Sequence, residues 1–125
     1  MNGNNIVADT SLLINFFNGV EPAGKILQNQ HIWISVITEM ELLSYSPLSK
    51  QETRLIQSFL DECILMDLTK PIRDIAIYTR KKYKLKLPDA IIAATSIHLG
   101  FPVVSMDVDF NKVKELNAIV LEPRN

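Results

Sequence analysis

The sequence predicts an α/β domain in three layers, with a central parallel sheet of about four or five short strands flanked by helices. Segments of strand character alternate with segments of helical character along the whole chain. The strand-like segments are apolar without strict alternation, which is typical of parallel strands buried on both faces. The chain has 125 residues, 47% of them hydrophobic, so residues 1–125 are expected to form one domain.

The N-terminal part of the chain is expected to form a strand, two short helices and a second strand. The apolar segment NIVA ends at Asp9, and the Asp, Thr and Ser side chains that follow are good helix caps. The pair Asn18-Gly19 interrupts the helical pattern, and Pro22 is typical of a new helix start. The β-branched and aromatic segment HIWISV then predicts a strand. These four elements are expected at residues 5–8, 12–17, 23–30 and 31–36.

The middle of the chain is expected to contain three helices and one weak strand. Pro47 ends the helical segment TEMELLSY, and Ser49 with Glu52 has the spacing of a capping box that opens the next helix. Leu55 is expected on the apolar face of that helix. Pro71 is typical of the first turn of a further helix. These elements are expected at residues 38–45, 50–63, 64–68 and 71–84.

The segment 87–110 contains a helix and a strand that organise the predicted site. Residues 90–99 are almost all apolar or small, which predicts a helix buried on every side. Gly100 is suited to end this helix, and a short β-branched strand follows at 103–104. The last strand is expected at 118–121.

Four acidic residues are expected to meet at the carboxyl edge of the sheet, where open parallel sheets bind ligands. Asp9 ends the first strand, Glu41 lies in the helix after the second, and Asp89 and Asp107 flank the buried helix and its strand. Two carboxylates about 4 Å apart repel by roughly 4 kcal/mol at an effective dielectric constant near 20, so such a group must take up protons or a cation. Oxygen ligands suit Mg²⁺ or Mn²⁺, and the expected metal ligands are Asp9, Asp89 and Asp107.

A metal held by carboxylates predicts phosphodiester hydrolysis. Such a metal lowers the pKa of a bound water and stabilises charge on a phosphoryl oxygen, and this hydrolysis requires both. The competing interpretation is that each aspartate only caps a helix, as aspartates between a strand and a helix often do. Glu41 resists that interpretation, because it lies inside an amphipathic helix, where a carboxylate is costly unless it is paired.

Other polar residues are expected to support these acids. The hydroxyl groups of Thr10 and Ser105 are predicted either to hydrogen-bond the metal ligands or to form local turns. Asp109 is either a further metal ligand or a turn residue, and Glu39 is expected in solvent.

Charge is distributed unevenly along the chain. The formal net charge is −1, which gives no bulk argument for nucleic-acid binding. The segment RKKYKLK nevertheless carries five cations and no acid. They form either a solvated helix end, favoured by the helix dipole, or a rim that contacts RNA phosphates. These cations are Arg80, Lys81, Lys82, Lys84 and Lys86.

The sequence predicts a cytoplasmic protein without a membrane segment. Cys63 is the only cysteine, so the chain has no internal disulfide, which fits a reducing compartment. The apolar run near the N-terminus is too short and too interrupted for a signal peptide or a membrane span.

Four motifs, in this order, resemble those of the PIN domain nucleases and, among them, the VapC-type toxins of toxin–antitoxin modules. IVADTSLLINFF, with Asp9, is similar to the first motif, and ISVITEMELL, with Glu41 directly before Leu-Leu, is similar to the second. LPDA contains Asp89 and SMDVDF contains Asp107, as in the third and fourth motifs.

The resemblance implies a PIN-like fold and an endoribonuclease that depends on Mg²⁺ or Mn²⁺. It implies that Asp9, Glu41, Asp89 and Asp107 carry the chemistry of RNA cleavage. It further implies a protein antitoxin as partner and a homodimer. Asn15 stands where many members have a further acid, so it is expected to support the site.

Two other classes of function fit parts of the sequence. A phosphoacceptor signalling domain of receiver type has a similar length and α/β alternation, and Asp67 would be its phosphoacceptor. No lysine follows the last predicted strand, where such a domain has one. The other alternative is a catalytically inactive PIN fold that acts as a binding module.

Overall fold

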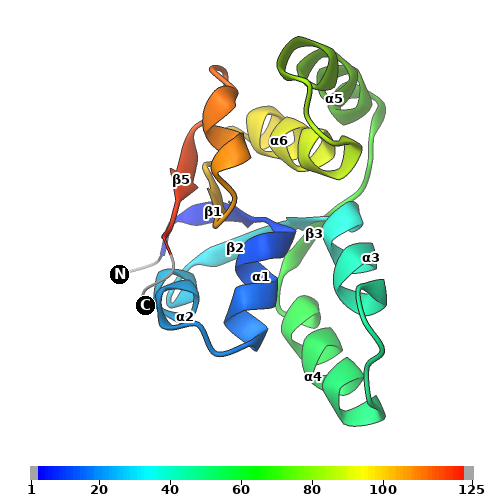
Figure 1. Ribbon diagram of the computed structural model, residues 1–125, viewed down its shortest axis with the longest axis vertical. Helices are drawn as coiled ribbons and strands as arrows, with labels where there is room; N and C mark the ends of the chain where they lie inside the picture. Colours follow the sequence, from blue (N-terminus) through cyan, green and yellow to red (C-terminus); the bar gives the residue numbers. More distant parts are fainter. Residues whose placement is uncertain (1–2, 123–125) are drawn as a thin grey trace.

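The computed structural model describes residues 3–122 and contains one parallel sheet of five strands (Figure 1). The strand order is β3-β2-β1-β4-β5, so β1 and β4 are neighbours although most of the chain separates them. The strands are β1 (Asn5–Ala8), β2 (His31–Ser35), β3 (Ile64–Met66), β4 (Val103–Ser105) and β5 (Ala118–Val120).

Helices cover both faces of this sheet, which confirms the predicted three-layer α/β architecture (Figure 1). The helices on the connections from β1 to β2 and from β2 to β3 cover one face, and those on the connections from β3 to β4 and from β4 to β5 cover the other. Right-handed crossovers require this change of face when the chain reverses its direction across the sheet. The first group is α1 (Thr10–Phe17), α2 (Glu21–Leu27), α3 (Val36–Ser44) and α4 (Lys50–Asp61), and the second is α5 (Lys70–Tyr83), α6 (Leu87–Leu99) and the 3₁₀ helix η1 (Val108–Lys112).

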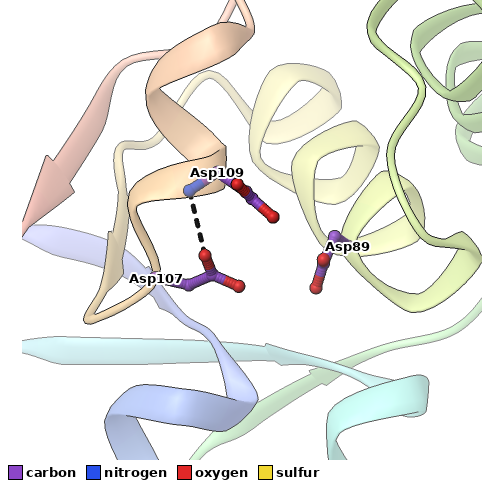
Figure 2. Close-up of side chains that lie close together, drawn as sticks. All are labelled: Asp89, Asp107 and Asp109. Atoms are coloured by element: carbon purple, nitrogen blue, oxygen red, sulfur yellow. Dashed lines mark hydrogen bonds between the residues drawn. The ribbon is translucent and has the colours of Figure 1, made fainter.

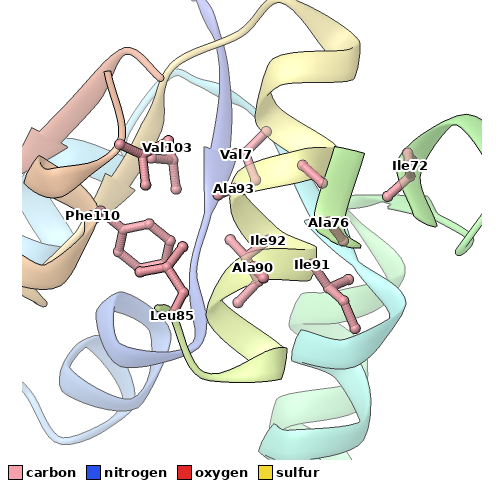
Figure 3. Packing of buried hydrophobic residues seen from close by; sticks show 12 residues of the cluster. Val7, Ile72, Ala76, Leu85, Ala90, Ile91, Ile92, Ala93, Val103 and Phe110 are labelled. Carbon is pink, nitrogen blue, oxygen red and sulfur yellow. The ribbon is translucent and has the colours of Figure 1, made fainter. Parts of the chain in front are cut away.

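The alternation of side chains along β1 divides the core into two clusters. Val7 packs with α5, α6 and η1 on one face of the sheet, as Figure 3 shows, while Ile6 and Ala8 pack with the helices of the other face. In α6, every residue from Ala90 to Ser96 is buried. This confirms the predicted enclosed helix for residues 90–96, whereas His98, inside the predicted range of 90–99, is exposed.

Local sequence signals explain most helix ends. Ser49 and Glu52 form the predicted capping box, in which the Glu52 N–H donates to Ser49 Oγ at 3.0 Å and the Ser49 N–H donates to Glu52 Oε1 at 2.9 Å. Gly100 ends α6 with φ of 74°, a left-handed conformation that suits glycine. The expected strand to residue 36 and helix from residue 38 are wrong at this boundary, because Ser35 caps α3 and the helix already begins at Val36.

Two other expectations from the sequence are wrong. Leu55 is 62% exposed and does not lie on the inner face of α4. The receiver alternative is also excluded, because such a fold has strand order 2-1-3-4-5. Here β3 is an edge strand, so Asp67, which follows it, is exposed and lies away from the central strands. Between residues 3 and 122 no helix is long and apolar enough to cross a membrane.

Candidate metal centre

The acidic residues lie where the strand order of the sheet reverses. The chain runs outward from β1 to β2 and β3, and then returns to β4 on the other side of β1. Ligands of open α/β sheets bind at such a switch point, beside the carboxyl ends of the strands. Asp9 follows β1 directly, and Asp107 lies two residues beyond the end of β4.

Three carboxylates form a group that can hold a cation. One oxygen each from Asp89, Asp107 and Asp109 lies within 4.8 Å of the others, and Figure 2 shows the three side chains converging from α6 and η1. Oδ1 of Asp107 accepts a 2.9 Å hydrogen bond from the backbone N–H of Asp109, which caps η1. Lys112 is 3.7 Å from Asp109 Oδ1 in a half-exposed ion pair. Asp107 therefore acts as a cap and still directs an oxygen into the group.

Asp9 lies beside this group but is not part of it. Hydrogen bonds from neighbouring residues fix its carboxylate. The side chain is only 3% exposed. Oδ1 accepts hydrogen bonds from the Leu12 N–H at 2.9 Å and the Ser11 hydroxyl at 3.0 Å, and Oδ2 accepts from Ser11 at 2.9 Å and Ser105 at 2.7 Å. Burial raises the pKa of Asp9, and these hydrogen bonds partly oppose that effect.

The electrostatics of Asp89 show that the four predicted acids are neighbours. Burial and the negative charges of Asp107, Asp9 and Glu41 together raise the pKa of Asp89 to about 6. Lys86 opposes it. A divalent cation would remove this repulsion, and oxygen-only donors are the set that Mg²⁺ and Mn²⁺ prefer. The residues present therefore fit such an ion.

Glu41 is held by the hydroxyl group of Thr10, on a neighbouring helix. The Thr10 hydroxyl donates a 2.7 Å hydrogen bond to Glu41 Oε1, and Thr10 Oγ1 is also 3.1 Å from the hydroxyl of Thr38. Glu41 is half-buried on α3, so this hydrogen bond provides the partner that a carboxylate at such a position requires. Thr10 therefore contacts Glu41, and not one of the three predicted metal ligands.

Ser11 is a supporting residue that the sequence did not single out. Its hydroxyl contacts both oxygens of Asp9, lies 3.2 Å from Ser105 Oγ and accepts a hydrogen bond from the Met106 N–H at 3.2 Å. The signal in the sequence is the position of Ser11 two residues after Asp9, which also fits a helix cap. Asn15 donates a 2.8 Å hydrogen bond to the backbone oxygen of Ser11, within α1.

The predicted basic segment is exposed at the end of α5 and in the turn before α6. Lys82 already has partners, because its ammonium group forms an ion pair with Glu115 at 3.2 Å and a hydrogen bond with the Tyr78 hydroxyl at 3.0 Å. Lys86 occupies the N-cap position of α6, three residues before Asp89. The remaining cations, Arg80, Lys81 and Lys84, are exposed.

This fold has known counterparts. The PIN domain family model matches residues 6–116, and the chain belongs to this family. The fold is similar to that of a chain in a toxin–antitoxin complex from Klebsiella pneumoniae, with a TM-score of 0.81 and 26% identity over 94% of this chain and 98% of that one.

Two further solved structures share the fold at lower identity. A chain of VapBC2 from Rickettsia felis, bound to a promoter DNA fragment, has a TM-score of 0.81 and 18% identity over 94% of this chain and 99% of that one. A chain of FitAcB from Neisseria gonorrhoeae has a TM-score of 0.77 and 19% identity over 91% and 96%. No curated protein sequence matches the chain.

Proposed function

We propose that this protein is a metal-dependent endoribonuclease that cleaves RNA phosphodiester bonds as the toxin of a toxin–antitoxin pair. The observation that carries the proposal is the convergence of Asp89, Asp107 and Asp109 beside Asp9 and Glu41 at the switch point of the sheet. Membership of the PIN domain family, whose members are generally nucleases, supports it.

The proposed roles follow from what each carboxylate contacts. Asp89, Asp107 and Asp109 would hold Mg²⁺ or Mn²⁺. Asp9, which is more deeply buried than these three, would be a further ligand of the same ion. When bound, such an ion activates water and stabilises charge on a phosphoryl oxygen. Oε1 of Glu41 accepts a hydrogen bond from the Thr10 hydroxyl. The proposed role of the other oxygen, Oε2, is to accept a proton from the attacking water.

The partner proposals rest on similar proteins. The structure from Klebsiella pneumoniae is a toxin–antitoxin complex, and the one from Rickettsia felis is VapBC2 bound to DNA from its promoter. By this similarity we propose a protein antitoxin as the inhibitor of this chain. The homodimer is proposed from the resemblance of the sequence motifs alone. We propose the cytoplasm as the location of this activity, because cellular RNA would be its substrate.

The experiment is cleavage of a mixed cellular RNA pool by purified protein in Mg²⁺ and in Mn²⁺, with and without a chelator. Asp89→Asn is the inactive control, and Glu39→Gln is the matched control, because Glu39 is an acid on α3 outside the acidic group. Cleavage by the wild type and by Glu39→Gln, lost with chelator or with Asp89→Asn, supports the proposal.

Two other results would reject it. Cleavage that persists in Asp89→Asn and in the chelator cannot come from this site. RNA binding without cleavage in either metal would support the alternative of an inactive PIN fold that acts as a binding module.

A further inference from the structure

Thr38 is a fully buried polar side chain beside the acidic site, and the roles proposed above do not use it. It is 0% exposed and lies in the first turn of α3, which follows β2 directly. Among residues 3–122, its hydroxyl group has one hydrogen-bond partner, the hydroxyl group of Thr10 at 3.1 Å. A buried hydroxyl is costly unless it is hydrogen-bonded, so this single contact sets the orientation of the Thr38 side chain.

The fold brings these two threonines together at the carboxyl ends of two paired strands. Strands β1 and β2 are parallel neighbours, and α1 and α3 begin at their carboxyl ends. Thr10 is the first residue of α1, and Thr38 is the third residue of α3. Glu41 follows Thr38 by three positions, which places both on one face of α3. The start of α1 therefore lies against the face of α3 that carries Glu41.

The hydrogen-bonding capacity of Thr10 fixes the direction of this chain of contacts. Its hydroxyl group has one proton but lies near two acceptors, Glu41 Oε1 at 2.7 Å and Thr38 Oγ1 at 3.1 Å. An ionised carboxylate, the form that a general base must have, can only accept hydrogen bonds. Thr10 therefore donates to Glu41, and its oxygen accepts a hydrogen bond from Thr38.

A chain of this kind orients the carboxylate at its end. Threonine in a helix has two common χ1 rotamers, so the Thr10 hydroxyl needs partners that select one of them. Thr38 provides the donor and Glu41 the acceptor, and each hydrogen bond in such a chain strengthens the next. Because Thr10 fixes Oε1 of Glu41, it also fixes the direction of Oε2, the oxygen proposed to accept a proton from water.

We propose that Thr38 is a positioning residue for Glu41, whose hydroxyl holds the Thr10 hydroxyl in the rotamer that aligns the Glu41 carboxylate. This inference rests on the proposed nuclease function and deepens it. Thr38 cannot touch RNA, because its side chain is fully buried. It should therefore act on kcat, the rate of the step that Glu41 assists, and not on KM.

The test compares two substitutions of Thr38 that separate hydrogen bonding from packing. Thr38→Val keeps the shape of the side chain and removes the hydroxyl group, whereas Thr38→Ser keeps the hydroxyl group and removes a methyl group. A role in packing alone would make Thr38→Ser the more harmful change, because it leaves a cavity in the core. The matched control is Thr79→Val on α5, where a buried hydroxyl donates to the backbone oxygen of Ile75 at 2.8 Å.

Cleavage of RNA in Mg²⁺ or Mn²⁺ is expected to separate the variants. In Thr38→Val, kcat should fall at least about tenfold while KM stays within about twofold, since a general base contributes about 10²–10⁴-fold to a rate. In Thr38→Ser and Thr79→Val, kcat should stay within about threefold of the wild type, because both leave the chain to Glu41 intact. Equal kcat in the two Thr38 variants, or a lower kcat in Thr38→Ser, would overturn the inference.

A double-mutant cycle in urea unfolding tests the same chain without any cleavage. Thr10→Val leaves the buried Thr38 hydroxyl without its partner, and a second change, Thr38→Val, removes that orphaned group. The urea midpoint of the double variant should therefore equal or exceed that of Thr10→Val, although Thr38→Val alone lowers the midpoint. Additive effects would show that the two hydroxyls are independent and that the inference is wrong, whatever the protein does to RNA. Coupling in a protein that cleaves no RNA would instead reject the nuclease proposal, and Thr38 would then stabilise only the fold.

Discussion

The hydroxyl group of Ser105 donates a 2.7 Å hydrogen bond to Oδ2 of Asp9, across 96 residues of sequence. The same hydroxyl oxygen accepts a 2.8 Å hydrogen bond from the backbone N–H of Asp107. One fully buried side chain therefore connects the ends of β1 and β4 and sets the position of the loop that carries Asp107 and Asp109.

Replacement of Ser105 by alanine is expected to weaken both the fold and the site. It leaves the buried Asp9 carboxylate and the Asp107 N–H each with one hydrogen bond fewer, at a cost of about 1–3 kcal/mol in the free energy of unfolding. Loss of a residue that orients metal ligands lowers activity by about 10–100-fold. Urea unfolding and RNA cleavage rates measure both effects. Ser44→Ala, at an exposed serine of α3, is the control, and a Ser105→Ala protein as stable as this control would contradict the assigned role.

Asp89 is expected to destabilise the metal-free protein at neutral pH. Burial and the neighbouring carboxylates raise its pKa to about 6 from 3.8, so its charged form is disfavoured in the folded state. Asp89→Asn should therefore raise the unfolding temperature in chelator at pH 7. The position is half-buried and partly screened by solvent, so we expect about 1 kcal/mol, or about 4 °C. An unchanged or lower unfolding temperature would show that the repulsion is negligible.

The same group predicts how the metal-free stability depends on pH. Because the pKa of about 6 in the folded state is above 3.8, the folded protein binds a proton more tightly than the unfolded chain does. This contribution to stability is fully present below pH 4 and is lost as the pH rises through 6. The difference in unfolding temperature between Asp89→Asn and the wild type should therefore shrink from pH 7 to pH 5. A difference that is constant over this range would contradict the assignment to Asp89.

The capping box of α4 gives a prediction about stability alone. Ser49→Ala removes the side chain that accepts the Glu52 N–H, at an expected cost of about 1 kcal/mol in the free energy of unfolding. Cleavage below the unfolding temperature should not change, because α4 contributes no residue to the acidic group. Ser58→Ala, at an exposed position of the same helix, controls for helix propensity. Equal unfolding by urea in the two variants would contradict the capping role.

The sequence was sufficient to predict the three-layer α/β architecture and the edge of the sheet where the acidic residues meet. Strand character, caps and the buried helix are local properties, and they place Asp9, Asp89 and Asp107 at the ends of elements. Glu41 was predictable because a carboxylate in an amphipathic helix requires a partner, which Thr10 provides.

Features that depend on packing were not predictable from local patterns. The position of β3 at the edge of the sheet follows from how the crossovers fit together, and no segment of the sequence encodes it alone. The grouping of Asp109 with Asp89 and Asp107, with Asp9 deeper and held by Ser11 and Ser105, depends on the path of the loop after β4. Leu55 is exposed because the buried face of α4 is the one that carries Ile56 and Leu60.

The most direct test of the account is a calorimetric titration of the metal-free protein with Mn²⁺. The wild type and Glu39→Gln should bind the ion saturably with similar affinity, and Asp107→Asn should bind it at least about tenfold more weakly, because Asp107 belongs to the converging group. No binding by the wild type, or equal binding by all three proteins, would show that the convergent carboxylates are not a metal centre.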